Sequence, residues 1–309
     1  MDSAAPLPPL LAIVGPTGTG KSALALELAQ ALGAEIVNLD SRQIYRGLDI
    51  GSAKPSAAER ALTPHHLYDV VAPDEPFDCA RYRELARAAI ADIHARGRAV
   101  VLVGGTGLYL KALRHGLFPG PPRDSALRMR LESLERDTPG ALHVRLAAVD
   151  PAAAARLHPR DRLRVIRALE VHELTGRPLS DWQAAHGFRA LELDIITIGL
   201  ALDRADLYAR LHARCGDMIA AGLVDEVRRL REAGYGPALA PLRSIGYREI
   251  GDYLDAQCSL EQAVASMAQA TRRLSKRQLT WFRADPYVRW FDAARVTVQE
   301  IQMAVGSRQ

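Results

Sequence analysis

Apolar residues follow two different spacings along the first hundred residues. Short runs of consecutive apolar residues predict three buried strands, at residues 10–14, 35–39 and 99–103. Between them, residues 22–32 and 77–95 repeat apolar residues every three to four positions, which predicts helices that end at Gly33 and Gly97. Strands that alternate with helices in this way indicate βαβ units and a parallel sheet.

The pattern changes at the Pro-Gly-Pro-Pro sequence of residues 119–122. From there to about residue 190 the chain is helical and arginine-rich, with no convincing strand. A strand returns at 194–202, helices follow at 203–233 and 259–284 with a break at 234–237, and the stretch after Val288 is uninformative. We therefore predict one α/β core domain, formed by residues 1–119 and 193–309, interrupted by an all-helical insertion domain at 120–192.

The composition is that of a soluble globular protein, with 309 residues, 48% hydrophobic and 25% charged. No run of about 18 apolar residues occurs, so we expect no membrane span. The N-terminus lacks the basic region and cleavage site of a secretory signal. Cys79, Cys215 and Cys258 are far apart, which argues against disulfides or a cysteine zinc site and fits a reducing cytosol.

The net charge of +4, from 40 basic and 36 acidic residues, permits an anionic partner without requiring one. Only four basic residues are lysine, which codon bias in a GC-rich genome explains. Position is more informative than number. Arg156, Arg160, Arg162, Arg164 and Arg167 crowd one short stretch, which is either a cationic track for an RNA backbone or a solvated helix face.

Residues 15–22 read G-P-T-G-T-G-K-S, between a predicted strand and a predicted helix, as a phosphate-binding loop requires. Its glycines let backbone N–H groups converge on an anion, and the helix N-terminus adds a positive dipole. Lys21 supplies a charge to phosphate oxygens and Ser22 is a candidate Mg²⁺ ligand. The predicted diphosphate-binding residues are Gly15, Pro16, Thr17, Gly18, Thr19, Gly20, Lys21 and Ser22.

The parts that accompany this loop in an ATPase are missing. The strand at 99–103 ends in Gly104-Gly105, where a Walker B aspartate is expected, and no N-K-x-D motif for guanine occurs. Asp40 is the one acidic residue at a predicted strand end. It is suited to hold Mg²⁺, to act as a general base over the phosphate site, or to cap the following turn.

Further motifs follow the loop in order: D-S-R-Q-I-Y at 40–45, G-S-A-K-P at 51–55, H-H-L at 65–67, G-G-T-G-L-Y at 104–109, R-A-L-E at 167–170, I-G-Y-R-E at 245–249 and K-R-Q-L-T-W-F-R at 276–283. Together they resemble the tRNA dimethylallyltransferase (tRNA isopentenyltransferase) family over residues 10 to 285. Tyr68 stands where we expect an aliphatic residue, and Ser22 replaces a common Thr but keeps the hydroxyl.

The resemblance implies a fold and a reaction. The core would be a P-loop NTPase-like parallel sheet flanked by helices. A dimethylallyl group would pass from dimethylallyl diphosphate to N6 of adenine 37 in tRNAs that read codons beginning with U. The loop would then hold the diphosphate leaving group, with Mg²⁺ as cofactor, and the missing ATPase parts are explained.

The resemblance also assigns roles to residues. Asp40 would be the general base, and Thr106 would contact the reacting region or the phosphates. Trp281 and Phe282 could stack on bases, although for Phe282 we favour the core. The helical insertion would clamp the anticodon stem. The expected tRNA contacts are Asp40, Ser41, Arg42, Gln43, Thr106, Arg128, Leu163, Arg164, Val165, Ile166, Arg167, Arg243, Ser244, Ile245, Gly246, Tyr247, Arg248, Lys276, Arg277, Gln278, Trp281 and Arg283.

Three other functions compete with this interpretation. A small-molecule kinase would use ATP at the loop. A non-enzymatic, nucleotide-gated RNA-binding module would bind RNA without forming a product. A related prenyltransferase would modify free AMP or ADP, but the arginine-rich insertion favours a macromolecular acceptor. The tandem His65-His66 has no carboxylate or cysteine at ligand spacing, which disfavours a metal site. We expect a cytoplasmic monomer.

Overall fold

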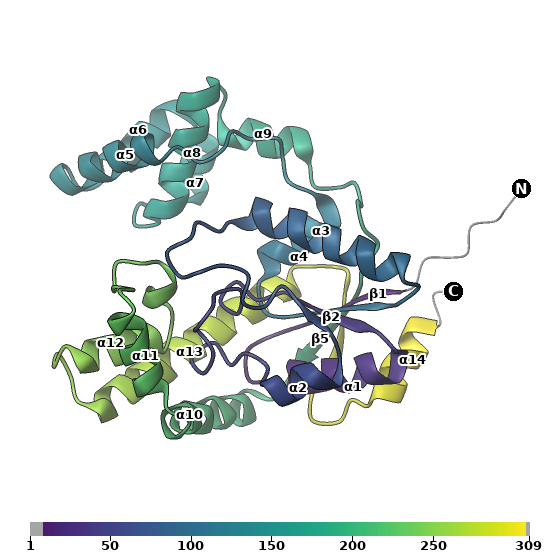
Figure 1. Cartoon of the computed structure of the whole chain (residues 1–309). Coiled ribbons are helices and arrows are strands. Elements are labelled where there is room, and N and C mark those ends of the chain that lie inside the picture. The colour runs from purple at the N-terminus through teal and green to yellow at the C-terminus, as the bar shows by residue number, and fades with distance from the viewer. Residues whose placement is uncertain (1–8, 307–309) are drawn as a thin grey trace, which may run out of the picture. The chain divides into compact units, whose positions relative to one another are not determined.

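A computed structural model describes residues 9–306, so most of the N-terminal segment judged not to be a signal lies outside the described residues. The chain divides into two compact units (Figure 1). The core unit comprises residues 1–114 and 193–309, and the helical unit comprises His115–Glu192. The second junction falls where the sequence predicts it, whereas the first lies between Arg114 and His115, five residues before the predicted boundary.

The core unit contains a six-stranded sheet in the order β3-β2-β4-β1-β5-β6. All of its strand pairs are parallel, which confirms the predicted α/β class. The strands are β1 (Leu10–Val14), β2 (Glu35–Asn38), β3 (His65–His66), β4 (Val100–Val103), β5 (Ile196–Ala201) and β6 (Val288–Asp292). β1, β2 and β4 therefore bring their carboxyl ends to one edge, where ligands of open α/β sheets bind.

Side chains of β1 alternate between the two faces of the sheet. Leu10, Ala12 and Val14 join one apolar cluster, with α3 (Cys79–Ala95), α4 (Gly107–His115) and the end of α13 (Leu260–Arg283). Leu11 and Ile13 join the other, with α1 (Lys21–Leu32) and α14 (Val298–Gly306). Burying each of the leucine, isoleucine and valine side chains contributes roughly 1.5–3 kcal/mol, so both faces are firmly covered.

A third apolar cluster lies beside the sheet. It is built from α10 (Arg204–Ala220), α11 (Leu223–Glu232), α12 (Tyr247–Leu254) and part of α13, together with the loop around Leu48. The single helix predicted at 203–233 is wrong, because the chain turns at Gly222, whose φ of 97° is left-handed. Neither α12 nor the short α2 (Ala57–Leu62) was predicted.

The helical unit has its own core. It consists of α5 (Ser125–Asp137), α6 (Ala141–Val149), α7 (Pro151–Arg156), α8 (Arg162–Thr175) and α9 (Leu179–His186). No strand lies within it, as the sequence predicts for this fully described segment. Among residues 9–306, no helix has both the length and the apolar composition that a membrane span requires.

Candidate active site

The phosphate loop connects β1 to α1, and its glycines are required by its geometry. Gly15, Gly18 and Gly20 have φ values of 136°, 87° and 83°, which side chains strongly disfavour. A Cβ on Gly15 would lie 2.4 Å from the carbonyl oxygen of Leu200, and one on Gly18 would lie 2.7 Å from a methyl of Leu211. The loop is thus packed tightly against β5 and α10.

Lys21 opens α1 and reaches back over the loop. Its Nζ donates a hydrogen bond of 2.7 Å to the carbonyl of Pro16, which also accepts one of 2.9 Å from Oγ1 of Thr19. Burial lowers the pKa of Lys21 from 10.5 to about 7; the Asp40 carboxylate opposes this shift and the Arg214 charge adds to it. An anion bound in the loop would restore the charge on this ammonium group.

Asp40 follows β2 and is held by backbone and side-chain contacts. Its N–H donates 2.8 Å to Oδ1 of Asn38, and its carbonyl accepts 3.0 Å from Nδ2 of the same fully buried Asn38. Its own Oδ1 accepts the Arg42 N–H at 2.8 Å. Within the described part of the chain, Oδ2 has no hydrogen-bond partner, so one carboxylate oxygen remains available to accept a proton.

The end of β4 passes very close to the end of β2. A Cβ on Gly104 would lie 2.2 Å from the carbonyl oxygen of Leu39, so only glycine fits there. Thr106 joins the two strand ends, because its N–H donates to Leu39 (3.1 Å) and its Oγ1 accepts the Ser41 N–H (3.0 Å). This close approach explains physically why glycine stands where an ATPase has an acid.

Arg214 and Gln278 reach the phosphate site from distant helices, although no sequence motif assigned them to it. Oε1 of Gln278 on α13 accepts the Thr17 N–H at 2.8 Å, while its Nε2 donates 3.1 Å to the carbonyl of Gly105. Arg214 on α10 approaches Oγ1 of Thr17 at 3.4 Å. Gln278 was expected only as a tRNA contact. Arg214 lies outside every motif, so nothing in the sequence pointed to its place in this site.

Two cavities adjoin at this edge of the sheet. One, of about 230 Å³, is lined by the phosphate loop, Ser22 and Gly104-Gly105. The other, of about 370 Å³, has an apolar wall that includes Met218 and Met267, and it carries several arginines. The residues that line both cavities are Thr17, Asp40, Ser52, Arg214 and Gln278. Asp40 therefore lies at the boundary between the cavity of the phosphate loop and the larger cavity.

The loop that contributes Ser52 is fastened from both sides. The buried carboxylate of Glu226 accepts backbone N–H groups of residues 49, 50 and 51 at 3.2, 2.8 and 3.2 Å, as well as the Tyr247 hydroxyl at 2.6 Å. Nε2 of Gln43 donates to the carbonyls of Ser52 and Ala53 at 3.1 and 2.9 Å. These hydrogen bonds fix the loop of residues 49–53, which contributes Ser52 to the boundary of both cavities.

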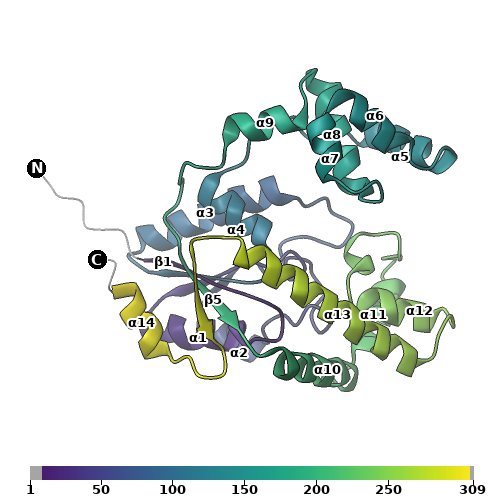
Figure 2. The same ribbon diagram turned by 180° about the vertical axis from the view of Figure 1, so that it is seen from behind.

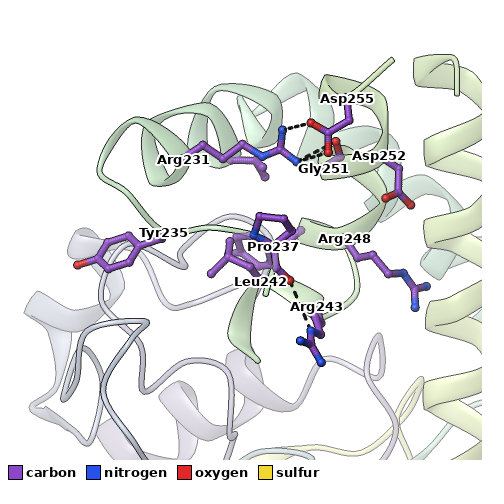
Figure 3. Close-up of a pocket in the computed structure, with 11 residues that line it drawn as sticks. Arg231, Tyr235, Pro237, Leu242, Arg243, Arg248, Gly251, Asp252 and Asp255 are labelled. Atoms are coloured by element: carbon purple, nitrogen blue, oxygen red, sulfur yellow. Dashed lines mark hydrogen bonds and ion pairs between the residues drawn. The ribbon is translucent and has the colours of Figure 1, made fainter. Parts of the chain in front are cut away.

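The structure brings together many residues predicted to bind tRNA. Those lining the larger cavity are Asp40, Arg42, Arg243, Ser244, Ile245, Tyr247, Arg248, Arg277 and Gln278. A small adjoining pocket of about 50 Å³ shares Arg243 and Arg248 (Figure 3). In it, Arg231 pairs with Asp255 at 2.7 Å, so this guanidinium is already neutralised.

Other predicted contacts lie elsewhere. Val165 and Ile166 are buried in the core of the helical unit, so their side chains are not exposed, and the tRNA contact expected at these two positions stays a prediction. Arg128 and Arg167 both pair at 2.7 Å with the buried Glu170, which uses much of their charge. Leu163 and Arg164 are exposed on the same helix.

Positions toward the end of α13 separate by their exposure. Phe282 is fully buried, as favoured from the sequence, whereas Trp281 remains 44% exposed. Lys276 and Arg283 are exposed as well. Thr106 lines neither cavity; its observed contacts are the turn hydrogen bonds described above.

The tandem histidines at β3 are engaged in structural bonds. Nδ1 of His65 lies 2.6 Å from the Thr63 carbonyl, and Nε2 of His66 lies 2.7 Å from the buried carboxylate of Glu35. Arg96 and Arg98 also pair with Glu35, and the bond from Arg96 above all lowers the pKa of this carboxyl to about 2. The cluster fastens β2 to β3 and the end of α3.

A glycine-rich loop after β1 and a carboxylate after β2, at the edge of a parallel sheet, define the P-loop class of fold, whose loop suits a phosphorylated ligand. The chain matches the family described as IPP transferase over residues 43–285. It is 52% identical to the tRNA dimethylallyltransferase of Syntrophobacter fumaroxidans (93% of this chain, 84% of the relative) and 51% identical to that of Geobacter sulfurreducens (92% and 91%).

Solved structures agree with this assignment. The tRNA isopentenylpyrophosphate transferase of Bacillus halodurans has a TM-score of 0.71 at 40% identity, covering 97% of this chain and 96% of that one. A eukaryotic dimethylallyltransferase described as acting on tRNA has a TM-score of 0.77 at 29% identity, covering 97% and 77%. The chain belongs to the tRNA dimethylallyltransferase family of prenyltransferases, which confirms the resemblance and the enzyme class and excludes the kinase and the non-enzymatic module.

Proposed function

We propose that this enzyme transfers the dimethylallyl group of dimethylallyl diphosphate to N6 of adenine 37 in tRNAs that read codons beginning with U, and releases diphosphate. One observation carries the proposal. The phosphate cavity and the arginine-bearing cavity meet at Asp40, so a donor and an acceptor can react across this carboxylate. Such positioning alone lowers the barrier of a two-substrate reaction by several kcal/mol.

The donor's diphosphate is placed in the smaller cavity. Amides of the phosphate loop, Lys21 and Arg214 converge on it and would stabilise the negative charge that grows as the bond from C1 to oxygen breaks. Ser22 and Asp40 line this same cavity and offer a hydroxyl and a carboxylate oxygen, donors that suit Mg²⁺. When bound there, Mg²⁺ would supply further positive charge to the diphosphate oxygens.

The acceptor adenine is placed in the larger cavity. Asp40 would accept a hydrogen bond from the exocyclic amine and take its proton as the bond between N6 and C1 forms. The unpartnered Oδ2 supports this role, while Asn38 holds the Asp40 backbone and the Arg42 N–H holds the other carboxylate oxygen. A general base of this kind contributes about 10²- to 10⁴-fold.

Adenine 37 must leave its stack in the anticodon loop to enter this site, which costs a few kcal/mol. Exposed side chains such as Arg243, Arg248 and Arg277 surround the entrance and would hold the RNA around it. We assign Arg164 and Leu163 of the helical unit to the anticodon stem. We propose that the enzyme acts on tRNA in the cytoplasm, and as a monomer.

One assay tests the proposal. The protein is incubated with Mg²⁺, dimethylallyl diphosphate and a tRNA that reads a UNN codon, and the digested RNA is examined for N6-prenyl-adenosine. We expect product with this tRNA, none with a tRNA carrying G37, and none with AMP. Asp40→Asn keeps the shape of the side chain and should lower kcat by about 10²-fold or more. Product from AMP but not from tRNA would instead support the free-nucleotide enzyme.

A further inference from the structure

Two arginines from different helices share one aromatic ring on the core unit. The guanidinium carbons of Arg204 on α10 and Arg272 on α13 lie 5.2 and 5.9 Å from the ring centre of Tyr208. These distances are those of cation–π contacts. The two helices adjoin along this side of the molecule (Figure 2). The ring of Tyr208 therefore contacts two positively charged groups, each within about 6 Å of its centre.

These two guanidiniums differ from many others on the core unit. Arg96 and Arg98 pair with Glu35, and Arg231 pairs with Asp255. Over residues 9–306, neither Arg204 nor Arg272 has a carboxylate oxygen within 4.0 Å. The chain thus neutralises many of its surface arginines but leaves this pair available.

The same side of α13 carries two further cations. At about 100° per residue, Arg272, Lys276 and Arg283 fall within about 40° of one another around the helix, along about 16 Å of its length. The part of α13 that lines the larger cavity lies on a different side and includes Met267, Leu274 and Gln278. None of the large exposed hydrophobic side chains belongs to the charged stripe.

We propose that Arg204, Tyr208, Arg272, Lys276 and Arg283 form a phosphate-binding face, here called the α10–α13 face, for the sugar–phosphate backbone of bound tRNA. The proposal rests on the proposed function, in which tRNA is the acceptor. It extends the expected tRNA contacts at 276–283 to residues that no family motif includes. Charge complementarity and continuity along α13 select RNA, and a surface without exposed apolar side chains suits a polyanion.

Tyr208 restricts the conformations of the two arginines on the α10–α13 face. An arginine fixed against a ring loses less conformational freedom when it binds a phosphate than one that moves freely in solvent. The ring therefore acts as a positioning group, and its hydroxyl is not needed for this purpose.

The test measures tRNA binding at several salt concentrations. The double variant Arg204→Gln/Arg272→Gln should reduce the slope of log K against log[salt] by about 1.5 to 2 and weaken binding about tenfold or more at moderate salt. Its affinity for dimethylallyl diphosphate and its melting temperature should not change. The control, Arg228→Gln/Arg229→Gln, removes two exposed charges from α11, one of them paired with Asp225, and should leave the slope near that of the wild type.

The ring is tested separately. Tyr208→Phe keeps the cation–π contacts and should bind tRNA like the wild type, whereas Tyr208→Leu should weaken binding severalfold. A double variant with the slope and affinity of the wild type would overturn the proposal, as would equal binding by the two Tyr208 variants. The prenylation assay on the same tRNA separates this proposal from the proposed function. If the wild type forms product, tRNA is the acceptor, whatever the slopes of log K against log[salt] show for the α10–α13 face.

Discussion

Lys21 is one of only four lysines in the chain, and its surroundings set an unusual chemical state. Its ammonium group is buried beside Arg214, which disfavours the charge, while Asp40 favours it. In the free enzyme the pKa is about 7, so near neutral pH a large share of the molecules carry an uncharged Lys21. A diphosphate in the loop reverses the balance, because its negative charge favours the ammonium form.

Donor binding should therefore take up a proton above neutral pH. Between pH 7.5 and 9 the free lysine is mostly uncharged but the bound one is charged, so the affinity for dimethylallyl diphosphate should fall by up to about tenfold per pH unit. Below pH 7 the lysine is charged in both states, and the dependence should flatten. Titration calorimetry at pH 8, in buffers of different ionisation enthalpy, should find nearly one proton taken up per donor.

Lys21→Arg provides the control for this prediction. A guanidinium stays protonated across the whole range, so the proton uptake should disappear even if the affinity itself changes. The last ionisation of a diphosphate monoester has a pKa of about 6, below this window. An unchanged pH slope in Lys21→Arg would show that another group titrates.

At the residue scale, the sequence predicted features formed by residues that are close together in the chain. The loop of residues 15–22 and Asp40 follow directly from motif and strand order, and the structure places them around one cavity. Arg214 was missed because it lies 197 residues from Thr17, inside an ordinary amphipathic helix. Val165, which was expected to contact tRNA, has a buried side chain, because a sequence motif also contains the core residues that support its exposed ones.

At the scale of elements, the ends of β2 and β4 position the proposed base. Gly104 approaches the backbone of Leu39 and Asp40 so closely that an added Cβ would lie 2.2 Å from one carbonyl oxygen and 2.8 Å from the next amide nitrogen. Backbone atoms cannot yield as a flexible side chain can. Any residue larger than glycine must push the two strand ends apart.

Gly104→Ala should therefore displace Asp40. We expect kcat for tRNA prenylation to fall by about 10²-fold, since a shift of about 1 Å has that cost, and stability to fall by about 1–3 kcal/mol. Steady-state kinetics and urea unfolding measure the two effects. Gly216→Ala is the matched control, because a Cβ at this position on α10 meets nothing within 4 Å. It should preserve kcat and add up to about 1 kcal/mol of stability; wild-type kcat in Gly104→Ala would refute the argument.

Elements with a strong periodic pattern were predictable, and those shaped by tertiary context were not. The predicted strand at 10–14 matches β1, and the helix predicted at 259–284 matches α13 within one residue at each end. β6 was missed because it is an edge strand with only one buried residue, Val288, so its apolar pattern is weak. The break between α10 and α11 depends on one glycine, whose left-handed conformation the periodicity does not reveal.

At the scale of the whole molecule, the two units have separate apolar cores. The core unit is built on three clusters around the sheet, and the helical unit on a fourth that shares no residue with them. The chain leaves and re-enters the core unit at one point, because the Leu193 N–H donates to the Arg114 carbonyl at 3.5 Å. The buried Arg114 pairs with Asp285 at 2.7 Å, which anchors this point to the α13–β6 turn.

Replacing residues 116–191 with a linker of about four Gly and Ser residues, a common length for short connections, should therefore leave a folded core unit. We expect one cooperative unfolding transition and an affinity for dimethylallyl diphosphate within about twofold of the wild type, because both cavities belong to the core unit. The value of kcat/KM for tRNA should fall at least about tenfold, as Arg164 and the other exposed cations of the helical unit are lost.

The control inserts the same linker after His115 in the full chain, so that only the connection changes and the helical unit remains. This variant should keep more of the tRNA turnover than the excised protein does. Wild-type kcat/KM after the excision would show that the helical unit does not contribute to tRNA binding. Loss of the cooperative transition would show that the core unit depends on the helical unit to fold, although their apolar clusters are separate.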